Sequence, residues 1–167
     1  MRTAPEIPTD WTKAERWVWE RITAGEPANF NSRVRDTEAL KPQTDKGWGE
    51  ERRVRAKFLQ TILTQREFVE ATPFGGVRIL GALIDDEPVN LEHARLQHEL
   101  WLESSRILTD FKCRSLRVDG GLSLENSFVT GLVDLSGANV TELMSLCGAS
   151  FKNDVILDSA NVGGHLE

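Results

Sequence analysis

Two cysteines and three histidines are the side chains of this 167-residue chain best suited to redox or metal chemistry. A redox pair or a zinc site needs such residues to converge at a short, defined spacing. Cys113 and Cys147 stand far apart and form no CxxC pair. His93 and His98 lie close together beside glutamates, whereas His165 is remote from both. We therefore interpret the histidines as surface residues and expect neither a disulfide nor a metal site.

Glycine pairs are the second feature that could carry chemistry, because glycine-rich loops bind phosphate groups. Gly75-Gly76 and Gly163-Gly164 are isolated pairs. A dinucleotide-binding loop instead needs the pattern GxGxxG between a strand and a helix. With no redox, metal or phosphate motif in the sequence, we expect no cofactor and no catalytic residue, which favours a protein that is not an enzyme.

The overall composition limits the class of protein further. The chain has 20 Lys and Arg against 26 Asp and Glu, a net charge of −6, which disfavours direct nucleic-acid binding. It is 40% hydrophobic and 28% charged, as is typical of a folded domain. No apolar run approaches the roughly 18 residues of a transmembrane helix, and no secretory signal is visible. These features predict a cytoplasmic protein with no membrane segment within this chain.

Charge and hydrophobic pattern both change near residue 79. Residues 1–79 carry 14 Lys and Arg and 12 Asp and Glu, whereas residues 80–167 carry 6 and 14. The first part holds four of the five tryptophans, and the second alternates short apolar runs with Gly, Ser, Asn and Asp. We therefore divide the chain into an N-terminal helical cap over 1–79 and an acidic repeat region over 80–167.

Two helices are expected in the cap, separated by an irregular segment over 26–49. Thr12 and Glu15 have the spacing of a capping box, and Gly25 is a candidate for the end of the first helix. One stripe of this helix is apolar, comprising Trp11, Ala14, Val18 and Ile22.

The second helix is expected over 50–65, where Val54, Phe58 and Ile62 repeat at helical spacing. Its polar side carries four basic residues, Arg52, Arg53, Arg55 and Lys57. They could form a basic contact surface, but a solvated helix face is the simpler interpretation.

The C-terminal half repeats with a period of eleven residues. One column of this repeat is apolar at all eight steps, comprising Leu80, Leu91, Leu102, Cys113, Leu124, Leu135, Leu146 and Leu157. A second apolar column, nine residues further on, runs from Val89 to Leu166. The columns at offsets of three and five residues contain only small or apolar side chains, with Asp85 as the charged exception.

Each repeat contains two short extended sides, because inward side chains alternate within pairs such as Ala138-Asn139-Val140 and Met144-Ser145-Leu146. Two eleven-residue repeats make one four-sided coil, so eight repeats make four coils around a filled core. Residues 90–103 have good helix formers and could be a helix. We prefer strands there, because the eleven-residue register passes through this segment without a slip.

Small-x-large sides at this spacing resemble those of the pentapeptide-repeat proteins. That resemblance implies a right-handed quadrilateral β-helix, which in that family has five residues on each side. This chain alternates five and six residues and is thus similar to a variant of the family. The expected fold class is mainly β: about four 22-residue coils of a right-handed quadrilateral β-helix, capped by an N-terminal two-helix region.

The cap also resembles part of a bacterial group of such proteins that is often labelled as membrane-associated oxidoreductases. The matching segments are 14–22, 28–31, 58–59 and 76–79. In this group a short helical region precedes a long pentapeptide-like helix. The resemblance implies no catalytic residue, because no redox motif in this chain accompanies it.

Binding surfaces are expected on the outer faces of the coils and in the groove between the helices and the first coil, because a filled helix has no lumen. Apolar side chains that we place outside the core form the candidate interaction surface, comprising Ile84, Trp101, Phe128, Leu132 and Leu143. As an alternative, the N-terminal helices could cover Trp101 and Ile84.

The last coil ends at Leu166-Glu167, where no polar cap follows the apolar columns. We expect the sequence to be a fragment of a longer repeat protein, truncated at its C-terminus. The alternative is end-to-end self-association through the C-terminal coil, because a bare end exposes unpaired backbone groups. Leu166-Glu167 could also be a cloning remnant.

Three functions remain open. The first is a non-enzymatic scaffold or protein-interaction module whose partner is another protein. The second, implied by the resemblance, is part of a membrane-associated oxidoreductase whose catalytic or membrane part lies outside this chain. The third, also suggested by pentapeptide-repeat proteins, is an acidic DNA mimic that binds a topoisomerase. Interspersed Ser, Asn and Gly weaken this third function, since they interrupt the rows of acids that mimicry needs.

Overall fold

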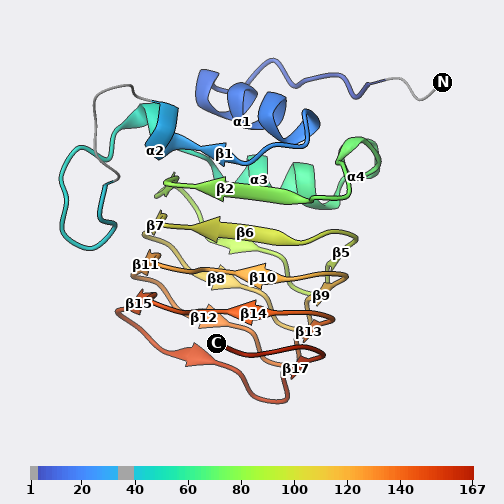
Figure 1. Cartoon of the computed structure of the whole chain (residues 1–167), viewed down its shortest axis with the longest axis vertical. Helices are drawn as coiled ribbons and strands as arrows, with labels where there is room; N and C mark the ends of the chain where they lie inside the picture. Colours follow the sequence, from blue (N-terminus) through green and yellow to red (C-terminus); the bar gives the residue numbers. More distant parts are fainter. Residues whose placement is uncertain (1–3, 34–39) are drawn as a thin grey trace.

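The computed structural model describes residues 4–33 and 40–167. Short helices lie at one end of a stack of parallel strands, and the chain winds away from them towards the C-terminus (Figure 1). No helix in these two ranges is both long enough and apolar enough to cross a bilayer.

The first helix forms as the sequence predicts. Helix α1 (Lys13–Thr23) is capped by Thr12, whose hydroxyl accepts a hydrogen bond from the Glu15 backbone N–H at 3.1 Å. The Glu15 carboxylate in turn accepts from the Thr12 N–H at 2.9 Å. The expected apolar stripe is buried, and Gly25 adopts a positive φ of 75° just after the helix. Capping box and stripe are therefore confirmed.

The rest of the cap differs from the two-helix prediction. Segment 26–49 holds β1 (Ala28–Asn29) and α2 (Phe30–Arg33). The expected helix over 50–65 is divided into two elements, η1 (Glu50–Arg52) and α3 (Ala56–Thr64), and a further helix, α4 (Arg66–Ala71), follows it. The break occurs because the Val54 N–H donates to the Leu83 carbonyl at 2.8 Å, which holds this stretch extended against the first coil.

Three of the four basic residues expected on a solvated helix face bind polar groups of the cap or of the first coil. Arg52 is buried and donates to the Asn31 side chain at 2.7 Å and to the Gly81 carbonyl at 3.1 Å. Arg53 binds both carboxylate oxygens of Asp85, at 2.8 and 3.0 Å. Arg55 pairs with buried Glu15. The solvated-face interpretation is therefore wrong for Arg52, whereas Arg53 and Arg55 are half-buried in ion pairs.

The repeat region forms four parallel sheets, one for each side of the coil, which we name A to D. Sheet A contains β1, β2 (Val77–Leu80), β6 (Leu100–Glu103), β10 (Leu122–Ser123) and β14 (Met144–Ser145). Sheet B contains β3 (Leu83–Ile84), β7 (Arg106–Ile107), β11 (Phe128–Val129) and β15 (Ser150–Phe151). Sheet C contains β4 (Val89–Asn90), β8 (Phe111–Lys112), β12 (Val133–Asp134) and β16 (Val155–Ile156). Sheet D contains β5 (Arg95–Leu96), β9 (Arg117–Val118), β13 (Asn139–Val140) and β17 (Asn161–Val162).

This architecture is a β-solenoid of about four coils. Strand partners in successive coils lie two eleven-residue repeats apart, as in the pairing of Leu122 with Met144. Segment 90–103 contains β5 and all of β6 rather than a helix, as the unbroken register predicts. Inward side chains fill the centre, and the most deeply buried column contains Val89, Leu100, Phe111, Leu122, Val133 and Met144, each 0% exposed.

The first coil departs from the predicted register by one residue. Ile84 pairs with Ile107, whereas Val89 pairs with Phe111, so the step to the next coil is one residue longer at Ile84 than at Val89. The extra residue lies in the turn over 85–88, which accommodates it without disturbing the sheets. The core positions here are consequently Ile79, Ala82 and Ile84, rather than Leu80, Leu83 and Asp85.

The last coil is less enclosed than the others. Its inward residues Phe151, Val155, Leu157 and Val162 are only partly buried, and Leu166 is 56% exposed. End-to-end self-association through this coil stays a prediction.

Candidate functional site

The five predicted surface residues do not form one patch. Ile84 was expected to point outward, but it is 0% exposed and occupies the core column beside Ile107. The prediction for Ile84 is wrong because the inserted residue in the following turn shifts the register. Leu132 is half-buried just before β12, away from sheet A. Phe128 points outward from sheet B but is only 8% exposed.

The segment over 40–49, which we call the strap, lies against sheet B and accounts for the low exposure of Phe128. The Arg106 guanidinium donates to the Asp45 carbonyl at 3.3 Å, and the Gln43 amide donates to the Ser150 hydroxyl. The strap and the residues around β11 and β15 line a half-open pocket of about 310 Å³, to which Phe128 contributes. Phe128 is therefore already covered by this chain.

Trp101 and Leu143 come together on the outer face of sheet A, where they line a groove of about 320 Å³. We call it the sheet A groove. Its lining comprises Glu99, Trp101, Glu103, Gly121, Leu122, Ser123, Glu125, Glu142 and Leu143. Neither the strap nor the cap helices contribute to this lining, so the groove lies on a face that the described chain leaves open.

A cation from the first coil holds Trp101 in place. Trp101 pairs with Arg78 across β2 and β6, and the Arg78 guanidinium carbon lies 4.3 Å from the centre of the indole ring. Arg78 also forms an ion pair with Glu99, which lines the same groove. Trp101 is half-buried, and Arg78 from β2 covers one face of its ring. Such stacking favours a planar guanidinium over an aromatic face.

Serines from the next coil hold two carboxylates in position. The Ser123 hydroxyl donates to Glu103 Oε1 at 2.7 Å, and the Ser145 hydroxyl donates to Glu125 Oε1 at 2.6 Å. Both serines are buried, whereas both glutamates are only half-buried. Because each bond joins consecutive coils, the solenoid repeat itself fixes the two acids in one row.

The groove carries more negative than positive charge, because Arg78 forms an ion pair with Glu99 alone among its acids. None of the ion pairs in 4–33 and 40–167 includes Glu103, Glu125 or Glu142. Burial raises the pKa of Glu103 and the neighbouring Glu125 adds to this rise, whereas the Ser123 hydrogen bond and the positive charge of Arg78 oppose it. Keeping Glu103 ionised is thus unfavourable in the folded protein.

Replacing this carboxylate with a neutral amide should stabilise the protein at neutral pH. A folded-state pKa above the unfolded one means that the contribution of Glu103 to stability is present below the unfolded pKa and is lost as the pH rises. Glu103→Gln should therefore increase the free energy of unfolding at pH about 7, and the gain should vanish below about pH 4. Urea denaturation at both pH values measures this difference.

Glu142→Gln is the matched control, because Glu142 lines the same groove but is exposed. It should leave the free energy of unfolding nearly unchanged at both pH values. A Glu103→Gln variant that is less stable than the parent at neutral pH would contradict the prediction.

The cysteines and histidines do not form a reactive centre in the described residues. Cys113 is buried in the core column, and burial raises the pKa of its thiol well above the usual value. Cys147 is exposed. No group of three His, Cys, Asp or Glu side chains in the ranges described is arranged to hold a metal ion.

Thiol labelling should separate the two cysteines. A thiolate is the reactive form, so a buried thiol with a raised pKa reacts slowly. Ellman's reagent should modify Cys147 at once in the native protein and should reach Cys113 only after denaturation. The matched variant Cys147→Ser should show no fast phase. A fast reaction of both thiols in the native protein would rule out the buried position of Cys113.

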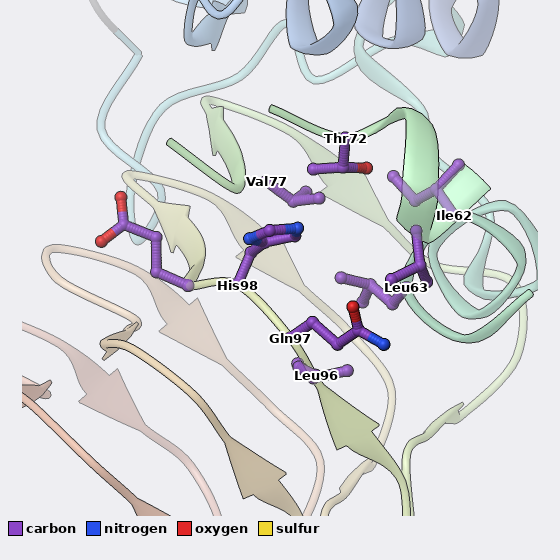
Figure 2. A pocket seen from close by; sticks show the side chains of 9 residues that line it. Ile62, Leu63, Thr72, Val77, Leu96, Gln97 and His98 are labelled. Atoms are coloured by element: carbon purple, nitrogen blue, oxygen red, sulfur yellow. The ribbon is translucent and has the colours of Figure 1, made fainter. Parts of the chain in front are cut away.

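The predicted binding groove between the helices and the first coil is nearly closed. Side chains of α3, such as Ile62 and Leu63, approach Val77 and Leu96 there, and His98 lies at one side (Figure 2). The remaining cavity holds about 10 Å³, which is space for one water molecule. At this point the junction has room for little more than one water molecule.

Sequence reasoning missed Arg78, Ser123 and Ser145 as parts of the groove. A signal was nevertheless present, because a serine follows twenty residues after both Glu103 and Glu125. This Glu-to-Ser spacing repeats with the 22-residue coil and indicates hydrogen bonds between neighbouring coils.

Comparison of the chain with protein-family models, curated proteins and solved structures finds no match.

Proposed function

We propose that the protein is a non-enzymatic interaction module that binds another protein through the sheet A groove. The observation that carries this proposal is the meeting of Trp101 and Leu143 with unpaired carboxylates on a face that neither cap nor strap covers. Aromatic side chains beside a pocket are frequent hot-spot residues of protein interfaces. A stack of hydrogen-bonded coils supplies a rigid support for such an anchor.

We also propose that the chain is a divergent relative of the pentapeptide-repeat proteins. The four-sided coil and the two-residue strands support this relationship. Successive coils pair Leu122 with Met144, a step of two repeats that accommodates alternate sides of five and six residues. We do not extend the proposal to DNA mimicry, because the row of acids on sheet A is not continued on sheet D, where Arg95 and Arg117 are paired neighbours.

Site-specific photocrosslinking tests the binding face. A photoreactive phenylalanine analogue at position 142, beside the groove, is compared with the same analogue at exposed position 139 on sheet D. In a lysate of the organism that makes the protein, we expect a discrete adduct only from position 142. Mass spectrometry identifies the adduct, and the purified partner is then titrated with the unlabelled chain.

The titration includes Leu143→Arg, which places a long charged side chain in the groove, and Asn139→Arg as the matched control on sheet D. Leu143→Arg should weaken binding by about tenfold or more, as expected for a residue at an interface centre. Equal adducts from both positions, or equal weakening by both variants, would show that the groove is not the binding face.

A further inference from the structure

Three carboxylates around the sheet A groove, those of Glu103, Glu125 and Glu142, form no ion pair in the described residues. Glu103 and Glu125 each commit one oxygen, Oε1, to a serine, and no hydrogen bond in the described residues uses Oε2 of either side chain. Glu142 stands at the same groove and is exposed. The acids that line this groove therefore have acceptor capacity to spare.

The placement of Glu103 and Glu125 on neighbouring strands suits a planar cation that bridges them. Glu103 and Glu125 follow paired residues of β6 and β10, so their backbones lie about 4.8 Å apart, the distance between neighbouring strands. A guanidinium presents five N–H donors in a flat fork and can bridge two such carboxylates. An ammonium is a point charge and makes no matching fork.

The chain already shows how this surface binds a guanidinium. Arg78 stacks on Trp101 and pairs with Glu99 at one end of the groove. Gly121 lies beneath the same indole, and a Cβ there would come within 3.2 Å of the Leu143 carbonyl oxygen, so a larger residue would crowd the groove. Beside Arg78, the same groove offers two further carboxylates, those of Glu103 and Glu125, and the part of the Trp101 indole that Arg78 does not cover.

We propose that the sheet A groove receives an arginine side chain from a segment of the partner protein, with its guanidinium against Trp101 and between Glu103 and Glu125. This proposal rests on the proposed function and names the chemistry of the partner. The occupant is an organic cation rather than a metal ion, because the three acids are not arranged as metal ligands in the described chain.

Peptide titration of the full chain tests the proposal. The probe is a blocked hexapeptide with one arginine among serines, and its partner probe carries citrulline, which has the same shape but no charge. Binding is followed through the indole N–H cross-peak of Trp101, assigned with Trp101→Phe. We expect a saturable shift of this cross-peak with the arginine peptide, and a dissociation constant about tenfold higher with the citrulline peptide.

Variants locate the recognition. Glu103→Gln combined with Glu125→Gln should weaken the arginine peptide about tenfold. The matched control, Asp154→Asn combined with Asp158→Asn, removes the same charge from exposed positions outside sheet A and should change affinity less than twofold. Circular dichroism confirms that each variant is folded before its titration.

Three results would overturn the proposal. Equal binding of the citrulline peptide would show that charge is not recognised. Equal weakening by the control variant would show a general electrostatic effect. Saturable binding without a shift of the Trp101 cross-peak would place the peptide elsewhere.

The outcomes also separate this proposal from the proposed function. If a crosslinked partner needs the groove but the arginine peptide does not bind, the interaction function stands and the arginine assignment falls. If the peptide binds the groove but position 142 captures no protein, the arginine site stands and the interaction function falls.

Discussion

Replacing Phe111 with alanine is expected to lower the free energy of unfolding by about 3–5 kcal/mol. Phe111 is 0% exposed in the core column of sheet C, where it pairs with Val89 above and Val133 below. Truncation would leave a cavity in the centre of a coil, and both neighbouring coils would lose contacts. Guanidinium denaturation followed by circular dichroism at equilibrium measures the loss.

Phe74→Ala is the matched control for this substitution. Phe74 is 96% exposed in the turn before β2 and loses almost no packing when truncated. Its variant should unfold within about 0.5 kcal/mol of the parent. If Phe111→Ala were equally mild, the filled centre of the solenoid would be wrong.

Replacing Glu15 with alanine is expected to lower the free energy of unfolding by about 3 kcal/mol. The Glu15 side chain is fully buried, and its carboxylate accepts from the Arg55 backbone N–H at 3.0 Å and from the Arg55 guanidinium at 2.7 and 2.8 Å. It also completes the capping box with Thr12. Removing it leaves Arg55 without its main partner and α1 without half of its cap. Tryptophan fluorescence follows unfolding here, because most tryptophans lie in the cap.

Glu20→Ala is the control on the same helix, since Glu20 is exposed. It should change the free energy of unfolding by less than about 0.5 kcal/mol. A small effect of Glu15→Ala would contradict the role of the buried pair with Arg55 in fixing α1 to the start of α3.

The solenoid could be predicted because its core repeats along the sequence. From Val89 onward, every coil places the same kinds of side chain at the same offsets, and each is buried as the period requires, except in the less enclosed last coil. The first coil could not be placed correctly. Leu80 and Leu83 fit the repeat as well as Ile79 and Ala82 do, so apolar type alone could not reveal an inserted residue in a turn.

Local patterns were also insufficient where distant contacts decide the structure. The helical spacing of Val54 and Phe58 is real, but a hydrogen bond from Val54 to Leu83 breaks the helix before Ala56. Arg52 was assigned to a polar face, although Asn31 and Gly81 provide it with a buried site. The helical spacing of residues in one segment carries no information about partners that are distant in the sequence.

The candidate site could be predicted only in part. Outward positions of Trp101 and Leu143 follow from the repeat, and so does the stacking of Glu103 and Glu125. The strap over Phe128 does not, since nothing in segment 40–49 indicates which sheet it will cover. Arg78 was likewise unassigned, because its pairing with Trp101 depends on the shifted register of the first coil.

The parallel pairing of each coil with the next has a mechanical consequence. Strands such as β10 are bonded only to the strands one coil before and one coil after. Tension applied along the stack from its C-terminal end would therefore peel the coils in sequence. Each release would free one whole coil, which is about 75 Å of extended chain. The extension of such a stack under force should therefore increase in equal steps, whereas a globular core unfolds in a single step.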